Sequence, residues 1–321
     1  MKIGVVGEIH QSGFEIFEKN NIEYFITNNI EENHLIEKLR DVDGIVVRTA
    51  EINKNILSQA KNLKIVSRHG VGYDNLDTEY LNNNKIGIAI TGKANAISVA
   101  EHVMTMMLCL TKNIFESDNL VKLGKFQEKG SLPNYFEIYN KKILILGFGR
   151  IGRALAKRCL GFEMEVYVHD PFLSEQEIKN HHCIPVNKEE GFKIADYISI
   201  HLPLNSETKN LISVDQFEIF KSNLILINTA RGGIINEDAL YDALKNKKIF
   251  GAGVDVFEKE PPIVNHKLFS LNNTLLTPHN AALTLECRKR MSVESCENVF
   301  YFLTKNKNLN RSNIINLNML D

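Results

Sequence analysis

The chain has 321 residues, of which 44% are hydrophobic and 24% charged, and its formal net charge is −1. This length predicts two domains of about 100–200 residues each, and the near-neutral charge gives no electrostatic reason to expect nucleic acid or an acidic membrane surface as a partner. No apolar run reaches the roughly 18 residues of a membrane span, and the five cysteines show no paired spacing, which predicts reduced thiols in a cytoplasmic protein.

Short apolar runs bounded by turn residues alternate with amphipathic stretches along the chain. We expect strands over 3–6, 45–47, 64–66, 86–90, 143–146, 165–168, 197–200, 224–228, 253–256 and 274–276. Helices such as 236–247 are expected between them. The first strand follows Met1 and Lys2 directly, which predicts that no signal peptide precedes the fold. Strands that alternate with helices form βαβ units, so the sequence predicts an α/β protein with parallel sheets.

One helix, expected over 98–115, is apolar around most of its circumference. Ser98 and Glu101 stand at its start with the S-x-x-E spacing of a capping box. A helix without a polar face must be buried on more than one side. It is therefore either a core helix of one domain or a helix that also packs against a second subunit.

The stretch "KKILILGFGRIGRALAKRCLGFEMEVYVHDP" at 141–171 holds three glycines between an apolar strand and a helix. Gly147 permits a tight turn, Gly149 lets the backbone approach a pyrophosphate, and Gly152 lets the helix pack against the strand. The helix N-terminus offers N–H donors to the anion.

The strand after this helix ends in Asp170, about 20 residues beyond the glycines. A carboxylate there accepts hydrogen bonds from the ribose hydroxyls and repels a 2′-phosphate, and the neighbouring Pro171 and Phe172 offer no cation. The pattern predicts a dinucleotide-binding loop that prefers NAD to NADP. The alternative is a structural glycine turn in an unrelated α/β protein.

Three further strands are each followed by a group suited to hydride chemistry: Arg231 in "LILINTARGG", Glu260 in "GVDVFEKEP" and His279 in "LLTPHNAA". Ligands of open parallel sheets bind beyond the carboxyl ends of the strands, where the glycine loop also lies. A histidine suits removal of a hydroxyl proton, a carboxylate orients it, and a guanidinium clamps a substrate carboxylate. Taken singly, each residue has an ordinary explanation as a solvated or helix-ending side chain.

These stretches together resemble the D-isomer-specific 2-hydroxyacid dehydrogenase family, in order and spacing, from about residue 43 to 290. The resemblance is carried by "SVAEH", "GFGRIG", "VHDP", "HLPLNSET", "NTARGGIINEDAL", "GVDVFEKEPP" and "TPHNAA". It implies an NAD-dependent enzyme in which Arg231, Glu260 and His279 form the catalytic set.

The resemblance also implies the fold and the cofactor contacts. A Rossmann NAD domain at 98–284 is inserted into a flavodoxin-like substrate domain made of 1–97 and 285–321, which explains why the glycine loop lies in mid-chain. The early "MKIGVVGEIHQSG" imitates a Rossmann start but lacks its spacing. Further implied contacts of the cofactor are Arg150, Ile151, His201, Pro203, Thr208, Thr229, Ala230 and Asp255.

The substrate domain is expected to supply anion contacts. Arg48 and Arg68 each stand at the end of a strand, and Gly70 and Val71 begin a loop whose N–H groups could cradle a carboxylate. Asn95 is expected near the hinge. The two arginines match positions at which 3-phosphoglycerate dehydrogenases of the family carry phosphate-binding arginines. The alternative for Arg68 is a surface salt bridge.

The chain departs from the family pattern at several places. His69 stands where a small residue is usual, Phe126 where a tryptophan is common, and "PHNAALT" differs from the more frequent "PHIAG". The chain stops at Asp321, so we do not expect the C-terminal serine-sensing domain of longer phosphoglycerate dehydrogenases.

The cluster His181, His182 and Cys183 has metal-ligand residue types, but adjacent residues of an extended segment point to opposite faces and no second ligand pair is near. We predict a surface loop there and no metal, since hydride transfer of this kind needs none.

The sequence thus predicts an NAD-dependent 2-hydroxyacid dehydrogenase that resembles a short D-3-phosphoglycerate dehydrogenase of serine biosynthesis. Alternatives are a reductase of hydroxypyruvate, glyoxylate or another 2-oxo acid, and an NAD-sensing corepressor-like interaction protein. A small anionic substrate is the expected partner, together with a second copy of the chain in a homodimer.

Overall fold

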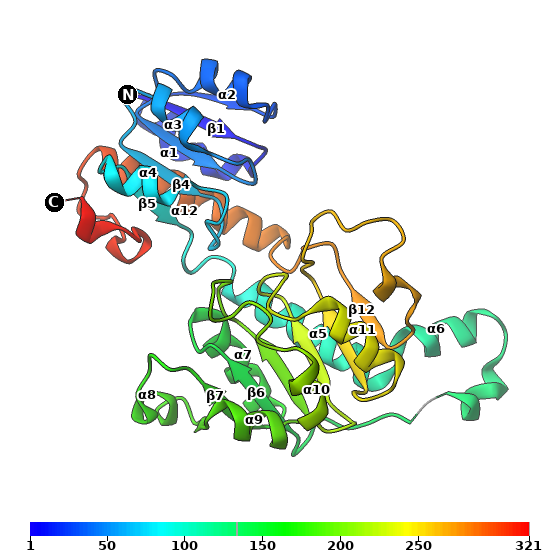
Figure 1. Cartoon of the computed structure of the whole chain (residues 1–321). Helices are drawn as coiled ribbons and strands as arrows, with labels where there is room; N and C mark the ends of the chain where they lie inside the picture. Colours follow the sequence, from blue (N-terminus) through cyan, green and yellow to red (C-terminus); the bar gives the residue numbers. More distant parts are fainter. Residues whose placement is uncertain (133, 321) are drawn as a thin grey trace. The chain divides into compact units, whose positions relative to one another are not determined.

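The computed structural model describes residues 1–132 and 134–320, which form two compact units. The terminal unit comprises Met1–Asn95 and Leu283–Asp321, and the central unit comprises Ala96–Ala282. Each change of unit lies two residues before the expected boundary. Figure 1 shows both ends of the chain in the terminal unit.

The sheet of the terminal unit is parallel throughout, with the strand order β2-β1-β3-β4-β5. This is the flavodoxin-like order, so the predicted fold of this unit is confirmed. The strands are β1 (Lys2–Val6), β2 (Glu23–Thr27), β3 (Gly44–Val47), β4 (Ile65–Arg68) and β5 (Gly87–Ile90).

The helix that follows the central unit completes the terminal unit: α12 (Leu285–Leu303) packs on β3, β4 and β5 (Figure 1). Its buried Asn298 donates to the carbonyl of Ile90, which ties the returning chain to the sheet. The remaining helices are η1 (Gln11–Gly13), α1 (Glu15–Lys19), α2 (Glu32–Lys38), α3 (Lys54–Gln59), α4 (Thr78–Asn83), η4 (Arg311–Asn313) and η5 (Leu317–Met319).

The central unit holds a parallel sheet of the order β12-β11-β10-β9-β6-β7-β8. Read from β8 to β11, this is the Rossmann strand order 3-2-1-4-5-6, with the switch point between β6 and β9. The predicted Rossmann domain is therefore confirmed. Its strands are β6 (Lys142–Leu146), β7 (Glu165–His169), β8 (Ile184–Pro185), β9 (Tyr197–Ile200), β10 (Ile225–Asn228), β11 (Gly251–Val254) and β12 (Thr274–Leu276).

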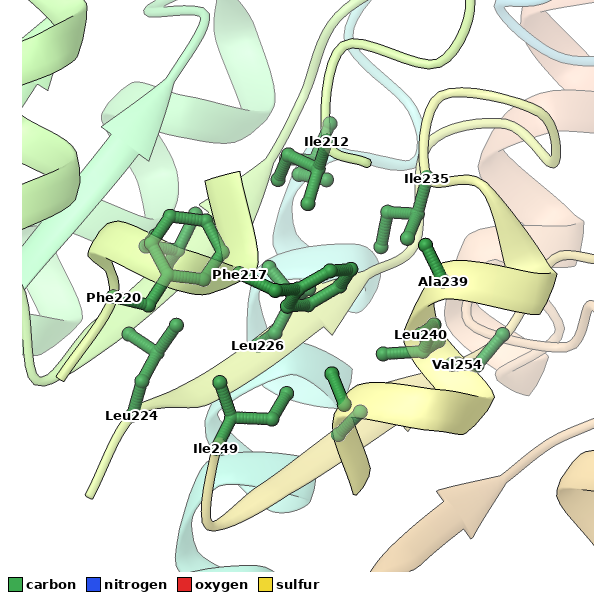
Figure 2. Close-up of a cluster of buried hydrophobic side chains, with 14 of the residues drawn as sticks. Ile212, Phe217, Phe220, Leu224, Leu226, Ile235, Ala239, Leu240, Ile249 and Val254 are labelled. Atoms are coloured by element: carbon green, nitrogen blue, oxygen red, sulfur yellow. The ribbon is translucent and has the colours of Figure 1, made fainter. Parts of the chain in front are cut away.

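Helices cover this sheet and bury its apolar strands, as expected for a parallel sheet. Figure 2 shows one such layer, in which Phe217 of α10 and Leu240 of α11 pack beside Leu226 of β10. The helices are α5 (Ala96–Lys112), α6 (Ile114–Lys122), η2 (Phe126–Ser131), α7 (Arg150–Gly161), α8 (Glu175–Lys179), α9 (Lys188–Ile194), α10 (Val214–Ile219), α11 (Glu237–Lys245) and η3 (Lys267–Ser270).

The expected helix over 98–115 is wrong at both ends. It starts at Ala96, so Ser98 lies inside the helix and not at its N-cap position, and the Ser98 hydroxyl donates to the carbonyl of Ala281 at 2.6 Å. It stops at Lys112, because Asn113 adopts a left-handed conformation (φ 47°) before α6 begins. The capping-box spacing is therefore coincidental.

All ten predicted strands are present, with ends shifted by up to two residues, and two strands were not predicted. Each lies at one edge of its sheet, β2 at Glu23–Thr27 and β8 at Ile184–Pro185, and each is only partly buried. A partly buried strand needs no continuous apolar run, so hydrophobicity does not reveal these two. Within the described residues, every helix is too short or too polar to cross a membrane.

Candidate active site

The glycine loop follows β6 at the switch point of the central sheet, the position at which open parallel sheets bind their ligands. Gly147 has a positive φ of 88°, and a Cβ there would lie 2.6 Å from the carbonyl oxygen of His201, which follows β9. A Cβ on Gly152 would lie 2.3 Å from the carbonyl oxygen of Gly147. Both glycines are therefore required by the protein's own packing.

Gly149 is different, because neither its conformation nor its surroundings require glycine. Its φ is −71°, and a Cβ would meet no atom within 4 Å. It caps α7, whose first residues Arg150 and Ile151 present the N-terminal N–H groups. An open glycine at a helix N-terminus is the arrangement that lets a pyrophosphate approach the backbone. The loop thus fits a dinucleotide.

Asp170 lies next to this loop, just beyond β7. One carboxylate oxygen accepts the N–H of Phe148 at 2.8 Å, and the other accepts the N–H of Phe172 at 3.0 Å. Each carboxylate oxygen has a second lone pair, so a diol can still bind. The two backbone bonds fix the direction of the carboxylate.

The other predicted cofactor residues follow β9 and β10. His201 is bonded to Ser199 Oγ through Nε2 at 2.9 Å, and Thr208 donates to the carbonyl of Pro203 at 2.6 Å. Thr229 is buried, and its Oγ1 has no hydrogen-bond partner among residues 1–132 and 134–320; Ala230 donates its N–H to Asn228. An unpaired buried hydroxyl beside a crevice is a group that a bound ligand can satisfy.

Glu260 and His279 form a direct pair at the carboxyl edge of the same sheet, after β11 and β12. The Oε2 of Glu260 lies 2.7 Å from Nδ1 of His279, while Oε1 accepts the N–H of Phe257 at 3.1 Å. His279 has φ 50°, a strained conformation for a residue with a Cβ. The pair lines a cavity of about 330 Å³ with Phe257, Pro261, Pro262, Phe269, Leu276, Thr277 and Pro278.

Arg231 follows β10, the strand next to β11 in the sheet. Burial alone would raise the pKa of Glu260, but the bonds from His279 and Phe257 and the charges of His279 and Arg231 hold that pKa below its usual value. One guanidinium nitrogen of Arg231 donates to the carbonyl of Ala230 at 2.7 Å. The structure therefore brings the predicted Arg, Glu and His together.

Asp255 ends in a buried carboxylate that the protein itself engages. Oδ1 accepts the Thr277 hydroxyl at 2.5 Å and the Asn280 N–H at 2.9 Å, and Oδ2 accepts the Ala281 N–H at 3.1 Å. The predicted nicotinamide contact can use only the lone pair that remains on Oδ2.

Arg48 and Arg68 lie at the carboxyl edge of the terminal sheet. Val47 of β3 pairs in register with Arg68 of β4, so the two arginines are on adjacent strand ends. Arg48 donates to the carbonyl of Glu8 at 3.4 Å, and Arg68 folds back to donate to the carbonyl of His69. They form a cationic edge within this unit.

The predicted carboxylate cradle after β4 is only partly available. The N–H of Gly70 donates to the carbonyl of Arg68 at 2.9 Å, so in this structure it is engaged within the chain, and Gly70 and Val71 stay predictions as substrate contacts. Gly70 is needed for another reason, since a Cβ there would collide with the Arg68 guanidinium. Asn95, the last residue of the first segment, has a buried Oδ1 that finds no hydrogen-bond partner in the described part of the chain.

His69 is buried, and its Nε2 lies 3.1 Å from Ser292 Oγ on α12. Burial first, then the charges of Arg68, Arg48 and Arg288, lower the pKa of His69 to about 4. Arg288 stands one turn before Ser292 on the same helix and was not predicted. The sequence alone could not reveal Arg288, because it lies near His69 only through Ser292, which contacts His69 across 223 positions of the chain.

Two predicted features outside the site can also be placed. Cys183 is buried and its thiol contacts the carbonyl of His181, whereas both histidines are exposed. No group of three or more potential ligands that could hold a metal occurs among the described residues. Phe126 begins η2, away from the sheet edge, and is exposed.

The arrangement of a Rossmann sheet, an open glycine loop and an Arg/Glu/His set defines a nucleotide-dependent dehydrogenase. The family described as "D-isomer specific 2-hydroxyacid dehydrogenase, NAD binding domain" matches residues 104–281. The chain belongs to this family, and its central unit is an NAD-binding domain.

Relatives of known sequence carry several activities. A hydroxypyruvate reductase of Thermotoga maritima is 36% identical over 277 residues, which cover 85% of this chain and 89% of the relative. A D-3-phosphoglycerate dehydrogenase of Archaeoglobus fulgidus is 35% identical over 300 residues, 93% of this chain but only 56% of the relative. The chain therefore spans about half the length of that relative.

A solved structure extends the likeness to the whole fold. The D-lactate dehydrogenase of Aquifex aeolicus, complexed with NAD and lactic acid, superimposes with a TM-score of 0.84 at 26% identity, covering 97% of this chain and 98% of the other.

Proposed function

We propose that the protein transfers a hydride between NAD and carbon 2 of a small 2-hydroxy or 2-oxo acid. The observation that carries this is the 2.7 Å pair of Glu260 and His279 with Arg231 beside it, at the edge of a sheet that also presents an open glycine loop. When bound, NAD supplies or accepts the hydride.

The residues of the chain then do three things. Arg231 holds the substrate carboxylate through paired hydrogen bonds. Glu260 keeps the imidazole of His279 bonded through Nδ1, which leaves Nε2 for the substrate oxygen. His279 takes the hydroxyl proton during oxidation and returns it to the carbonyl oxygen during reduction.

The test is the loss of NADH absorbance with a panel of 2-oxo acids. Arg231→Ala is expected to abolish turnover while NADH still binds, as measured by fluorescence, because the clamp is lost and the cofactor loop is intact. Turnover near the wild-type rate in this variant would refute the assignment. No turnover with any 2-oxo acid, combined with NADH-dependent assembly, would favour the corepressor-like alternative.

For the substrate we propose 3-phosphoglycerate and its oxo product phosphohydroxypyruvate. This proposal assigns the carboxylate to Arg231 and the second anion to the cationic edge of the terminal unit, where Arg48 and Arg68 end adjacent strands and Arg288 adds charge near His69. Charge-assisted hydrogen bonds to a phosphate contribute roughly 1.5–3 kcal/mol each. The relatives are named D-3-phosphoglycerate dehydrogenase, hydroxypyruvate reductase or glyoxylate reductase, so their names do not choose among these substrates.

The deciding measurement is kcat/KM for phosphohydroxypyruvate against hydroxypyruvate and glyoxylate. Arg68→Ala should reduce the preference for the phosphorylated acid, and Arg40→Ala, which removes an exposed arginine at the opposite end of β3, should leave it unchanged. A wild-type preference for the unphosphorylated acids would replace this proposal by a hydroxypyruvate or glyoxylate reductase.

We also propose a cytoplasmic homodimer. α6 and η2 extend from the central unit (Figure 1) and bury none of their residues, although Phe115, Leu123 and Phe126 are large and apolar. Such an exposed surface is expected to be covered by a second copy. Sedimentation of the protein as a 36.5 kDa monomer at micromolar concentration would contradict the dimer.

A further inference from the structure

The segment that carries His279 is held by hydrogen bonds to one residue, Asp255. Asp255 accepts the N–H groups of Asn280 and Ala281, the two residues after His279, and its own carbonyl accepts the N–H of His279 at 2.9 Å. Thr277, two residues before His279, donates its hydroxyl to the same carboxylate. Bonds on both sides of His279 thus converge on Asp255.

These hydrogen bonds, which we call the Asp255 clamp, hold the backbone of His279 in an unusual conformation. His279 has φ 50°, and a residue with a Cβ stays in that strained region only when its surroundings impose it. The bonds to Asp255 impose it, and Ser98 of α5 adds a bond to the carbonyl of Ala281. The direction of the imidazole therefore depends on how firmly Thr277 to Ala281 is held.

A second residue of α5 reaches the clamp. His102 Nε2 lies 3.1 Å from Thr277 Oγ1, and 3.8 Å from the Asp255 carboxylate. Because the Thr277 hydroxyl proton is already donated to Asp255, the hydroxyl can only accept from His102. His102 must therefore carry its proton on Nε2, and it fixes the rotamer of Thr277.

We propose that His102 is a positioning residue for the reaction: its Nε2–H orients the Thr277 hydroxyl, which with Asp255 holds the backbone of His279 in its strained conformation. In the described part of the chain the His102 ring contacts Thr277 and Asp255 rather than His279 or Glu260, so it acts through Thr277. Burial lowers the pKa of His102, against the charge of Asp255, which supports a neutral imidazole. This role rests on the proposed function.

The test compares variants that differ in one hydrogen bond. His102→Leu removes the donor and His102→Gln keeps an N–H; Thr277→Val removes the hydroxyl and Thr277→Ser keeps it. Misplacement of a catalytic group costs between about tenfold and a hundredfold in rate. We expect this loss in kcat for His102→Leu and Thr277→Val, with KM and NADH affinity within about twofold of wild type, since the hydrogen bond adds little to ligand binding.

His102→Gln and Thr277→Ser are expected to recover most of the rate. The matched control is Thr111→Val. Thr111 lies on α5, the helix that also carries His102, nine residues further along the chain. Its hydroxyl is fully buried and bonded to Met107 and Tyr197. Thr111→Val should lower the melting temperature as much as Thr277→Val does and leave kcat unchanged. Equal kcat losses in both valine variants would reduce the role to stability and overturn the proposal.

NMR of the histidine rings separates this inference from the proposed function, because it needs no turnover. The His102 ring should show the Nε2–H tautomer, and the His279 ring signals should shift in His102→Leu but not in Thr111→Val. If the wild type reduces no 2-oxo acid, the proposed function fails, but the ring signals still test whether His102 orients His279 through Thr277 and Asp255. Unchanged His279 signals in His102→Leu would overturn it.

Discussion

Each of the two sheets of this protein has a topological switch point, and different residues stand at the two switch points. Both sheets are parallel, and in both the strand order reverses next to the first strand of the unit, β1 or β6. The loop after that strand begins in both with a glycine at positive φ, Gly7 (91°) and Gly147 (88°). At the central sheet this loop is an open nucleotide-type turn. At the terminal sheet its neighbour is Arg48, whose Cβ a side chain on Gly7 would meet at 3.2 Å.

The residues that follow the first glycine make the difference. After Gly147 the chain enters α7, twelve residues long, and Gly149 faces open space. After Gly7 it enters the three-residue η1, and a Cβ on Gly13 would lie 2.7 Å from the backbone oxygen of Ser292. Topology provides a crevice in both sheets, and the local sequence decides whether it faces a dinucleotide or a small anion.

The largest expected effect separates two imidazole–carboxylate pairs of the central unit. His279 and Glu260 are half-exposed at 2.7 Å, whereas His266 and Glu237 are mostly buried at 2.9 Å. His279→Gln should lower kcat/KM by about 10²–10⁴-fold, the usual contribution of general acid–base catalysis. His266→Gln should cost stability and leave kcat/KM near wild type. Steady-state kinetics and thermal melts of the two variants measure these effects. Comparable losses of kcat/KM in His279→Gln and His266→Gln would contradict a catalytic role for His279 alone.

A smaller effect tests what the central loop recognises. Asp170→Ala removes the carboxylate that repels a 2′-phosphate and that binds ribose. Since a hydrogen bond to a charged group contributes about 1.5–3 kcal/mol, the preference for NADH over NADPH should fall by about ten- to a hundredfold. The ratio of kcat/KM for the two cofactors measures it. An unchanged ratio would mean that Asp170 only holds the N–H groups of Phe148 and Phe172.

The two glycine loops can be compared directly by adding one methyl group to each. Gly149→Ala should weaken NADH binding by about tenfold, which corresponds to 1.4 kcal/mol, without lowering the melting temperature, because the methyl group occupies space that only a ligand would use. Gly13→Ala should lower stability by about 1–3 kcal/mol through overpacking against Ser292 and leave NADH affinity unchanged. The opposite pattern would contradict the assigned roles.

Much of this architecture could be predicted from the sequence because the strands are buried on both faces and therefore apolar. The glycine spacing and the groups after β10, β11 and β12 were visible for the same reason: each directly follows a recognisable strand. The weakest predictions concerned polar contacts made across the fold. Ser98 resembled a helix cap, yet its hydroxyl bonds to Ala281, far along the chain.

The roles of His102 and Thr277 were equally hidden, since 175 positions separate two residues whose side chains meet. The same holds for Gly70, whose N–H turned out to be engaged by Arg68. Periodicity reports which face of an element is buried, but not which buried polar groups find each other. Those partners are set by tertiary packing, and one sequence without its fold contains no direct signal of them.

The smallest expected effect concerns a feature that the two sheets share. Each has a histidine directly after a strand, the buried His69 after β4 and the partly buried His201 after β9, and each bonds to a serine, Ser292 and Ser199. Burial is the main cause that lowers the pKa of His69 to about 4, and it lowers the pKa of His201 to about 3.

In the unfolded chain both histidines titrate near 6.5, so between that pH and the folded-state pKa the unfolded state binds more protons. Stability is therefore lost as pH falls from 6.5 towards 4, by about 1 kcal/mol per histidine between pH 7 and pH 5.5. His69→Gln and His201→Gln should each flatten this slope in urea denaturation. If anion binding at Arg48 and Arg68 is the task of the terminal edge, added phosphate should flatten the slope further in the wild type and in His201→Gln, because a nearby anion favours protonated His69. A slope that neither substitution changes would show that the two histidines already titrate normally in the folded protein.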